Sequence, residues 1–426
     1  MTSIVTSLAV GSLLSAAAIA QPPGYTVTDL GTLPGGTFSQ ASFVSNSGLV
    51  TGVATAADGT QHSVLWLGGR IIDITPRAKG QNSEAFSFNQ WGQASVQAEV
   101  ATKDPNNENF CAYGSGLKCL PFLWVYGSMI PLPTLGGNNG SVGNINNRGL
   151  MAGFAENSTR DPECPPGVSL SGTGPQVLDF EAVVWGPGIN QVRELRPLPG
   201  DTVGAALWIN DDGQAVGMSG SCADTELPPL AFGPHAVLWD RDGTPTDLGN
   251  LGAAVLNVSL SVNNQGQAVG FSSLTPHSSP FNGTHAFLWT RGTGMRDLGT
   301  LPGDVVTGGT AINDRGQVVG PSFDPDGNPR AFLWQNGVMS DLNTLAPGSP
   351  LYLLFGTAIN SSGQIAGFGA TSTGDIHGFL ATPGNGRAAG QSAGAESEGA
   401  VSPMVLPEEV RRLIRQRLPS GLGVRK

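Results

Sequence analysis

Charged residues are scarce in this chain: they make up 12% of its 426 residues. Basic residues are the scarcer kind, with 21 Lys and Arg against 32 Asp and Glu, which gives a net charge of −11 at pH 7. Because non-specific nucleic-acid binding needs Lys and Arg to replace the counterions of phosphates, an acidic body excludes that function. The hydrophobic share of 39% is too high for a disordered chain, so a folded core is expected.

The chain also lacks the His-Glu-x-x-His motif of zinc enzymes and the phosphate-binding loop of nucleotide enzymes. We therefore predict no catalytic residue, no cofactor and no metal from motifs. Glycine and proline are abundant instead, with 62 and 31 copies. Such a composition is typical of short strands joined by tight turns in an all-β fold.

The first twenty residues are expected to be an export signal. An apolar stretch runs from Ile4 to Ile19 and ends in Ala18-Ile19-Ala20, the small-x-small pattern that signal peptidase accepts, although no Lys or Arg precedes it. A membrane anchor is the alternative, but the stretch is barely long enough to span a bilayer. We expect residues 1–20 to be removed, a secreted, extracellular or periplasmic protein, and no membrane span after cleavage.

If the chain is exported, its four cysteines can form disulfides, because exported proteins keep disulfides in an oxidising environment. Cys111, Cys119, Cys164 and Cys222 allow two disulfides in three possible pairings. Unpaired thiols are the alternative. Zinc binding is disfavoured because no two of these cysteines have the spacing that is typical of zinc ligands.

Three short motifs recur along the chain in fixed order, and each has seven copies. The first is Asp-Leu-Gly-Thr-Leu-Pro-Gly, as at Asp297–Gly303. The second is Ile-Asn-x-x-Gly-Gln-x-Val-Gly, as at Ile312–Gly320. The third is His-Ala-Phe-Leu-Trp, as at His285–Trp289, and it places six of the eight Trp residues at one repeat position. Recurrence of three motifs together indicates a repeat protein.

Each motif has the features of a strand or a turn. The Asn of the second motif can close a turn with its own side chain, and the following Gly supplies a positive φ. Gln-x-Val-Gly alternates like a half-buried strand, and Ala-Phe-Leu-Trp reads as a strand buried on both faces. With the first motif as a fourth strand, the repeat has the content of one propeller blade.

We therefore predict a seven-bladed β-propeller of four-stranded antiparallel blades over residues 21–383. A sandwich would need more strands than sheets normally hold, and an open solenoid would need capping repeats. The chain begins with a copy of the fourth strand, Tyr25–Leu30, and its last repeat stops after the third strand, at Phe379–Ala381. The N-terminal strand should therefore complete the last blade and close the ring.

Residues 384–426 differ in character from the repeats. Gly384–Ala400 consists mostly of Gly, Ala and Ser, which is typical of a flexible linker. Pro407–Leu418 reads as a short basic helix. This tail is either a segment that docks on a partner or a frayed terminal helix.

The three motifs resemble those of the probable extracellular repeat of the HAF family, over about Tyr25 to Pro383. The resemblance implies a bacterial exported protein with propeller-like repeats. It brings no known activity and no catalytic residue. Some members end in a sorting signal with a membrane helix, which the Arg-rich tail lacks.

Residues that recur in every blade are poor catalytic candidates, because a ring needs only one active site. We expect the repeated Asp and Asn to be turn residues. Four histidines precede the repeat Trp or its equivalent by four residues, and as equivalent positions they would be spread around the ring rather than converge on a metal. They are His62, His235, His285 and His377. Asp240–Gly243 and Asp324–Asn328 resemble calcium loops but lack the closing Glu.

Extra length is confined almost wholly to one loop per blade, between the second and third strands of blades 2, 3 and 4. These loops span Ala98–Leu120, Ala155–Phe180 and Ser219–Pro234, and they contain all four cysteines. They should rise together on one face, and such insertions usually mark the binding side of a repeat protein. The loop positions suggest that Cys111 pairs with Cys119 and that Cys164 pairs with Cys222.

Two functions follow from this face. The first is a non-catalytic binding module, expected to be a monomer, for an extracellular glycan, peptide or cell-surface partner. Its candidate contacts are Lys103, Asp104, Phe110, Tyr113, Glu156, Arg160 and Asp224. The alternative is a polysaccharide hydrolase or lyase that uses non-repeated carboxylates, two of which would lie about 5–9 Å apart in a pocket. Its candidate acids are Glu163, Asp179, Glu181 and Glu226.

Overall fold

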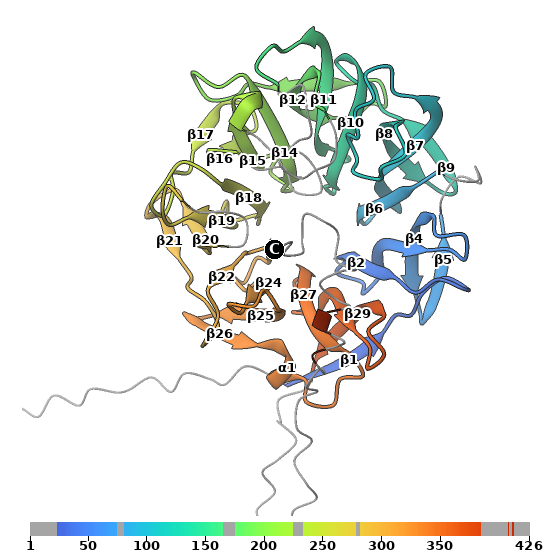
Figure 1. The fold of residues 1–426 in the computed structure, drawn as a ribbon, viewed down its shortest axis with the longest axis vertical. Helices are drawn as coiled ribbons and strands as arrows, with labels where there is room; N and C mark the ends of the chain where they lie inside the picture. Colours follow the sequence, from blue (N-terminus) through green and yellow to red (C-terminus); the bar gives the residue numbers. More distant parts are fainter. Residues whose placement is uncertain are drawn as a thin grey trace, which may run out of the picture.

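Seven antiparallel sheets stand as blades around a ring in the computed structural model of the chain (Figure 1). The structure describes residues 24–74, 81–164, 175–224, 233–277 and 282–384, together with 408, 411 and 412. Two short helical turns, η1 (Cys222–Asp224) and α1 (Leu342–Leu345), lie between strands. The predicted seven-bladed, all-β propeller is confirmed.

Each blade runs from an inner strand beside the ring centre to an outer strand at the rim (Figure 1). Blade 1 consists of β2 (Ser39–Val44), β3 (Val50–Thr55), β4 (Gln61–Leu67) and β5 (Arg70–Asp73). Blade 2 consists of β6 (Ser83–Phe88), β7 (Gln93–Lys103), β8 (Leu117–Val125) and β9 (Ser128–Pro131). Blade 3 consists of β10 (Gly136–Ile145), β11 (Met151–Arg160), β12 (Leu178–Trp185) and β13 (Val192–Leu195). Blade 4 consists of β14 (Val203–Ile209), β15 (Ala215–Gly220), β16 (His235–Trp239) and β17 (Pro245–Asp247).

The remaining blades follow the same order. Blade 5 consists of β18 (Asn257–Val262), β19 (Ala268–Ser273), β20 (Thr284–Thr290) and β21 (Gly294–Asp297). In blade 6 the inner strand is in two pieces, followed by three regular strands: β22 (Val306–Thr307), β23 (Ala311–Ile312), β24 (Val318–Phe323), β25 (Pro329–Gln335) and β26 (Val338–Asp341). Blade 7 consists of β27 (Tyr352–Ile359), β28 (Ile365–Ala370), β29 (Ile376–Pro383) and the N-terminal strand β1 (Tyr25–Asp29).

The N-terminal strand closes the ring, as predicted. β1 pairs antiparallel with β29 and places Tyr25 opposite Pro383 and Asp29 opposite Phe379. The buried Tyr25 hydroxyl donates a hydrogen bond to the Gly363 carbonyl at 3.2 Å. Strands from the two ends of the repeat region therefore share one sheet, which gives blade 7 its fourth strand and closes the ring.

Two glycines of the second motif serve different purposes. Gly266 has φ +71°, the left-handed conformation that the predicted turn requires. Gly270, four residues on, does not have a positive φ, but a Cβ there would overlap the Val258 carbonyl oxygen on the neighbouring inner strand. A register shift between Ser259 and Ser261 marks a bulge at this point. The second glycine is therefore needed because two backbones approach closely.

The Asn of the second motif makes hydrogen bonds both within its turn and to the next blade. In blade 5 the Asn263 Oδ1 accepts from the backbone N–H of Gln265 and Gln267 at 3.0 Å each, which confirms the predicted turn role. Its Nδ2 donates to the Asn313 carbonyl of blade 6 at 3.0 Å. The same inter-blade bond recurs from Asn89 to Asn146, Asn146 to Asn210, Asn210 to Asn263, Asn313 to Asn360 and Asn360 to Ser45.

This Asn ladder predicts a specific loss of stability. Asn263→Ala removes a buried donor and leaves the Asn313 carbonyl without it, so we expect destabilisation by about 1–3 kcal/mol. Equilibrium unfolding in urea measures the change. Blade 1 has Ser45 at this position, so Ser45→Asn should add the missing bond toward blade 2 and raise the unfolding midpoint. An Asn263→Ala protein as stable as the wild type would show that the ladder contributes nothing.

Two of the six repeat tryptophans tie the third strand of a blade to the link that enters the same blade, whereas the buried Nε1 of Trp66 has no hydrogen-bond partner. Trp185 and Trp239 are buried, and their Nε1 atoms donate to the carbonyls of Pro133 and Arg196 at 2.7 Å. Each carbonyl lies between the outer strand of one blade and the inner strand of the next. Recurrence of Trp thus reflects packing and anchoring of the link, not chemistry.

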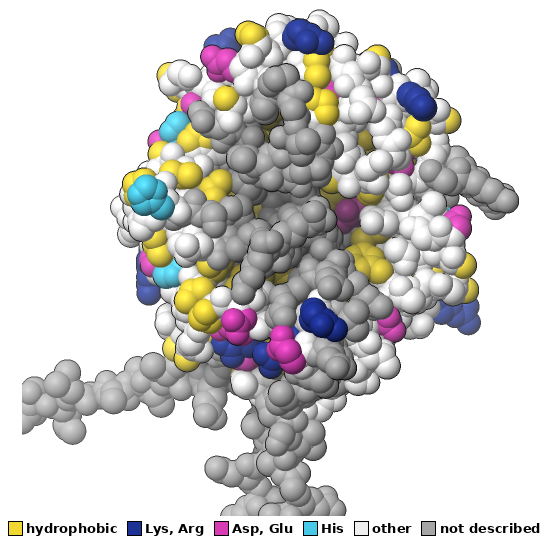
Figure 2. All heavy atoms as spheres, in the orientation of Figure 1, with side chains coloured by type: hydrophobic (Ala, Val, Ile, Leu, Met, Phe, Trp, Pro, Cys, Tyr) yellow, Lys and Arg dark blue, Asp and Glu magenta, His cyan; other side chains and the backbone are white. Residues whose placement is uncertain are grey.

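The repeat histidines hold the third and fourth strands of a blade together in three cases. The Nδ1 of His62, His285 and His377 lies 2.7, 2.9 and 3.0 Å from a carboxylate oxygen of Asp73, Asp297 and Asp29, respectively. In blade 4, His235 instead contacts Asp201 of the incoming link at 2.9 Å. The histidines visible in Figure 2 lie toward the rim of the ring. The expected structural role is confirmed.

Several predicted segments lie outside the described residues. These are the export signal of residues 1–20 and residues 385–426 of the linker and tail, apart from 408, 411 and 412. Within the described part of the chain, no helix has the length and hydropathy that a membrane span requires. Glu408, Arg411 and Arg412 are helical, at positions where the sequence predicts the short basic helix.

Candidate functional site

The three long loops leave the same edge of the ring. They connect β7 to β8, β11 to β12 and β15 to β16, the second and third strands of blades 2, 3 and 4. Because the strands of a blade alternate in direction, these loops share an edge with the links between blades. We call this edge the loop face. The opposite edge is the turn face. It contains the turns that join the first strand of a blade to the second and the third strand to the fourth.

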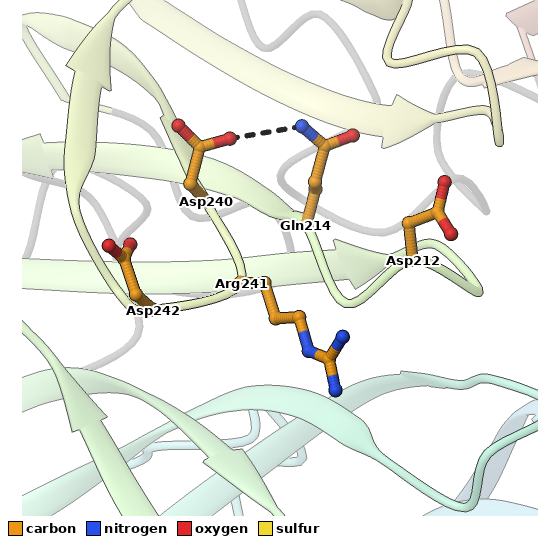
Figure 3. Close-up of a pocket in the computed structure, with 5 residues that line it drawn as sticks. All are labelled: Asp212, Gln214, Asp240, Arg241 and Asp242. Atoms are coloured by element: carbon orange, nitrogen blue, oxygen red, sulfur yellow. Dashed lines mark hydrogen bonds between the residues drawn. The ribbon is translucent and has the colours of Figure 1, made fainter.

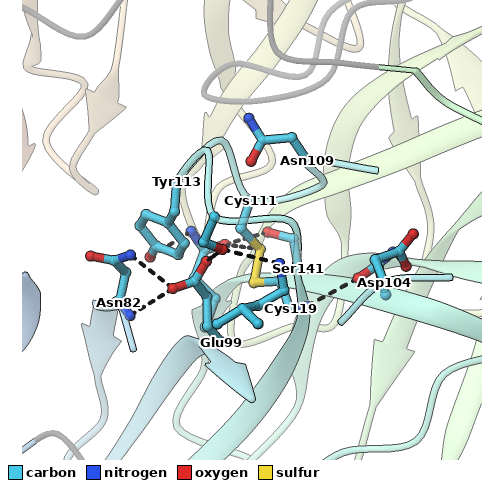
Figure 4. Close-up of a disulfide and its surroundings, with 12 residues drawn as sticks. Asn82, Glu99, Asp104, Asn109, Cys111, Tyr113, Cys119 and Ser141 are labelled. Atoms are coloured by element: carbon cyan, nitrogen blue, oxygen red, sulfur yellow. Dashed lines mark hydrogen bonds between the residues drawn. A yellow bond between two sulfur atoms is a disulfide. The ribbon is translucent and has the colours of Figure 1, made fainter. Parts of the chain in front are cut away.

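Two disulfides fasten the loops, in the predicted pairing. Cys111 is bonded to Cys119 within the loop of blade 2 (Figure 4). Cys164 is bonded to Cys222 and joins the loop of blade 3 to that of blade 4. Among the described residues, the group of metal-type ligands that converges is Asp161 with Cys164 and Cys222, and its two sulfur atoms are consumed by this disulfide.

An apolar core lies beneath the loops and includes both disulfides. The Phe110 ring is 5.3 Å from the Phe154 ring, which is 6.2 Å from the Phe180 ring. Phe110 comes from the loop of blade 2, whereas Phe154 and Phe180 lie on β11 and β12 of blade 3. The loops are therefore extensions of the propeller core, with hydrophobic anchors of their own.

Buried carboxylates join the loop of blade 2 to blade 3. Glu156 Oε2 accepts from the backbone N–H of Asn139 at 2.9 Å, and Asp104 Oδ2 accepts from the Nδ2 of Asn139 at 3.0 Å. The Gln176 Nε2 bridges Glu156 and Glu108 at 3.1 and 3.4 Å. Glu108 also accepts from the two backbone N–H groups after Gln176, at 2.7 and 2.9 Å. All three acids are buried.

The electrostatics of this network oppose ionisation while its hydrogen bonds favour it. Burial, and secondly the charge of Glu108, raise the pKa of Glu156 to about 8. Burial also raises the pKa of Glu108. Every hydrogen bond made by the two carboxylates comes from an N–H donor, which stabilises the charged form. With their oxygens occupied by the protein itself, these acids support the loops.

A second polar cluster surrounds the Cys111–Cys119 disulfide. Figure 4 shows Glu99 and Tyr113 beside it. Glu99 Oε2 accepts from the backbone N–H and the Nδ2 of Asn82 at 2.8 Å each. The Tyr113 hydroxyl accepts from the Nε2 of Gln97 at 3.2 Å, and burial raises the pKa of Tyr113. The loop of blade 2 is thus held from within by a disulfide and by hydrogen bonds.

The predicted contact residues divide into two groups. Asp104, Phe110 and Glu156 are buried in the network and core just described. Tyr113 is half-buried, and Lys103 and Arg160 are exposed. Asp224 lies in η1, beside the Cys164–Cys222 disulfide. The residues that sequence reasoning missed are Glu108, Asn139 and Gln176, whose partners belong to a different blade or a distant part of the loop.

Lys103 and Arg160 occupy equivalent positions in neighbouring blades. Lys103 is the last residue of β7, and Arg160 is the last residue of β11. The second motif ends at Val96 in blade 2 and at Gly153 in blade 3, and each cation follows that end by seven residues. Both strands are longer than the other second strands and carry these cations onto the loop face. The two exposed cations are therefore one blade apart on the same edge.

The acids of the enzyme hypothesis do not form one site. Glu163 is exposed, Asp179 and Glu181 lie on β12, and Glu226 lies outside the described residues. Burial, followed by the charges of Asp179 and Glu194, raises the pKa of Glu181 to about 9. The Glu181 Oε2 is buried and makes no hydrogen bond.

Glu181 stands where blades 1, 4, 5 and 7 have the repeat histidine, four residues before the Trp. Its neighbour Glu194 pairs with Val183 just as Asp297 pairs with Phe287 in blade 5. In blade 3, Glu181 and Glu194 therefore occupy the two positions that a His–Asp pair occupies in blades 1, 5 and 7, where the pair links the third and fourth strands. Burial is the main reason for the raised pKa of Glu181, and the facing acid adds to it. A comparison of the repeats could have revealed this pair of acids.

A shallow cavity of about 750 Å³ opens on the turn face of blade 4 (Figure 3). It is lined by Asp212, Gln214, Asp240, Arg241 and Asp242 from the two turns of that blade. The Gln214 Nε2 donates to Asp240 at 3.0 Å. None of the predicted contacts lines this cavity. Asp240–Gly243 and Asp324–Asn328, the two segments that resemble calcium loops, form hairpin turns.

Comparison with known proteins gives distant structural matches. No family model matches the sequence, and no curated protein does. Among solved structures, the β-propeller domain of the Trilobed protease from Pyrococcus furiosus has 11% identity and a TM-score of 0.41, with 85% of this chain and 94% of that chain covered.

Two further structures are similar at the same level. A streptogramin B lyase has 9% identity and a TM-score of 0.44, with 85% of this chain and 98% of that chain covered. The BP39L lectin from Burkholderia pseudomallei has 14% identity and a TM-score of 0.38, with 86% and 97% covered.

Proposed function

We propose that the chain is an exported, non-catalytic binding module that holds a glycan, peptide or cell-surface partner on its loop face. The observation that carries the proposal is the construction of this face. Two disulfides, three Phe rings packed against one another and a network of buried acids fix the long loops. A surface ordered in advance loses little conformational entropy when a partner binds.

The same construction argues against the hydrolase or lyase. A general acid must present its carboxyl group to a substrate, but Glu108 and Glu156 direct theirs to N–H donors of the protein. Glu181 is buried with a partnerless oxygen beside Asp179 and Glu194. The resemblance to the exported HAF family agrees with a binding role outside the cell and remains part of this proposal.

Lys103 and Arg160 suggest the chemistry of the partner. They are exposed cations on neighbouring blades of a protein with a net charge of −11. An acidic group on the partner, such as a uronic acid or a carboxylate side chain, would be complementary to both. Binding through them should weaken with salt, because exposed charges are screened over about 10 Å at 0.1 M ionic strength.

The test compares two loop-face variants with one turn-face variant. Retention of the full-length protein on immobilised alginate and on poly-glutamate is measured by surface plasmon resonance. We expect Lys103→Ala and Arg160→Ala each to weaken retention about three- to tenfold, as the loss of one exposed ionic contact would. Arg70→Ala, an exposed cation beside the β4–β5 hairpin on the turn face, should bind like the wild type.

Two outcomes would count against the loop-face proposal. One is that Lys103→Ala and Arg160→Ala bind as the wild type does on every surface that retains it. The other is that Arg70→Ala reduces retention as strongly, which would indicate general charge attraction in place of a site.

A further inference from the structure

An exposed aromatic pair stands on the turn face of blade 2. Trp91 is 60% exposed and lies in the turn between β6 and β7, and Tyr126 is 83% exposed and lies in the turn between β8 and β9. Other blades place small, polar or charged residues at the Trp91 position: Ser47, Arg148, Asp212, Gln265, Arg315 and Ser362. Blade 2 therefore departs from the repeat by exposing apolar rings to solvent.

Tyr126 occupies a backbone conformation that tyrosine rarely adopts. Its φ is +47° in the two-residue turn that it forms with Gly127. The same turn position is Gly68 in blade 1, with φ +57°, and Asn336 in blade 6, with φ +52°. Glycine and asparagine tolerate the left-handed region, whereas a bulky side chain is strained there. An aromatic ring kept at a strained position points to a function for that ring.

Hydrogen bonds fix both rings in place. The Trp91 Nε1 donates to the Asn147 carbonyl of blade 3 at 2.7 Å, and the Tyr126 hydroxyl donates to the Trp91 carbonyl at 3.3 Å. The Tyr126 ring lies against Gly92, about 3.5 Å from the site of a Cβ on that glycine. The pair is thus a preformed surface whose faces remain open, and little side-chain entropy is lost on binding.

Polar groups surround the pair, and the acid of the neighbouring turn is occupied: Asp211 accepts from the backbone N–H and the Nδ2 of Asn147 at 2.8 and 2.9 Å. In blade 4 the Gln214 Nε2 donates to Asp240, and in blade 6 the Gln317 Nε2 donates to Gln335. The equivalent of Asp240 and Gln335 in blade 2 is Val125, which leaves the Gln93 amide nitrogen without that acceptor. The nearest cation along the neighbouring turn, Arg148, is directed to Asp212 at 3.4 Å.

We propose that Trp91 and Tyr126 form a binding platform for a neutral polysaccharide on the turn face. Sugar rings present C–H groups to the electron-rich faces of aromatic rings, and their hydroxyl groups can accept or donate at the edges. Gln93, two residues after Trp91, offers an amide donor next to this turn. A neutral ligand fits because the platform has no charge of its own. This platform is separate from the loop face and does not depend on the proposed function of that face.

The test uses substitutions taken from the other blades, which the turns are known to accommodate. Trp91→Ser introduces the residue of blades 1 and 7, and Tyr126→Asn introduces that of blade 6. Retention of the full-length protein is measured by affinity electrophoresis in gels that contain amylose, β-1,3-glucan, xylan or mannan. We expect at least one of these to retard the wild type and each variant to weaken the retardation about tenfold or more.

Leu67→Ala is the matched control, because Leu67 is an apolar residue 56% exposed at the corresponding hairpin of blade 1. It should be retarded like the wild type, and Lys103→Ala should be as well, since it alters only the loop face. Tyr126→Asn should also raise the unfolding temperature, since it removes the strained tyrosine. A gain in stability together with a loss of binding would separate a functional ring from a structural one.

Three results would overturn the platform. The first is a wild type that none of the four polysaccharides retards. The second is retardation that Trp91→Ser and Tyr126→Asn leave unchanged. The third is a change of sedimentation coefficient in these variants without a change in retardation, which would make the aromatic pair a contact between copies of the chain.

Discussion

Replacing Glu181 with Gln is expected to remove a large part of the loss of stability that the wild type suffers as the pH rises from about 5 to 9. Glu181 has a pKa raised from 4.5 to about 9 in the folded protein. Between these values the unfolded chain has released the proton while the folded chain still holds it. The unfolded state therefore binds fewer protons, and the free energy of unfolding falls with increasing pH.

The loss should be on the order of 5 kcal/mol, because each pH unit between the two pKa values lowers the free energy of unfolding by about 1.4 kcal/mol. Urea unfolding at intervals between pH 5 and pH 9 measures it. The Glu181→Gln protein should show a flatter profile and should be the more stable protein at pH 9. A profile parallel to that of the wild type would contradict the assignment.

Glu181→His sharpens the same experiment. It restores the residue that pairs with Asp297 in blade 5, here opposite Glu194. The His variant should be more stable than the wild type at pH 7. Glu194→Gln removes one of the charges that raise the pKa of Glu181, so it should flatten the pH profile less than Glu181→Gln does.

Removing the Cys164–Cys222 disulfide should destabilise the protein more than removing Cys111–Cys119. The first closes a loop of 58 residues and the second a loop of 8. From the entropy of loop closure in the unfolded chain, we expect losses of about 4 and about 2.5 kcal/mol. Double Ser variants, which leave no free thiol from the broken pair, are compared by equilibrium unfolding without reductant.

The two disulfides should also differ in their effect on binding. Cys164–Cys222 joins the loops of blades 3 and 4, so its loss frees them from each other, whereas Cys111–Cys119 stiffens the loop of blade 2 alone. A larger destabilisation from the Cys111→Ser/Cys119→Ser pair would contradict the loop-closure argument. Peptide mapping of the non-reduced protein tests the pairing itself.

The ring could be predicted from the sequence because each repeat contains the same local signals. Gly266 and its equivalents mark turns by a requirement for positive φ, and Trp289 and its equivalents mark buried strands. Each requirement concerns only a few consecutive residues, so it can be recognised in the amino-acid sequence. The closing strand at Tyr25 was visible for the same reason, as a fourth strand without its first three.

The hydrogen bonds between blades could not be read in the same way. Asn263 satisfies its own turn with Oδ1, as Asp or Ser would, and only its Nδ2 reaches Asn313 of the next blade. The spacing of blades around a ring sets that distance, and no local pattern encodes it. The preference for Asn over Asp at this position in blades 2 to 7 was the available hint.

The sequence predicts the positions of the long loops correctly but does not predict which of their residues are buried. Because long loops usually lie at the surface, the sequence predicts Asp104, Phe110 and Glu156 as contacts, yet the structure buries all three. A loop long enough to fold over its own disulfide can form a core, and the partners of its acids come from another blade. Lys103 and Arg160 stay exposed, and for them the predicted contact role still stands as a prediction.

The central claim, a binding propeller without catalysis, is tested most directly by measuring retention and turnover in the same incubation. The purified protein is applied to an array of glycans, polysaccharides and acidic peptides, and the supernatant over each spot is analysed for released fragments by mass spectrometry. We predict retention that Lys103→Ala and Arg160→Ala weaken, with no fragment released over any spot. Fragments that disappear in the Glu181→Gln or Asp179→Asn variant would contradict the account and identify an enzyme.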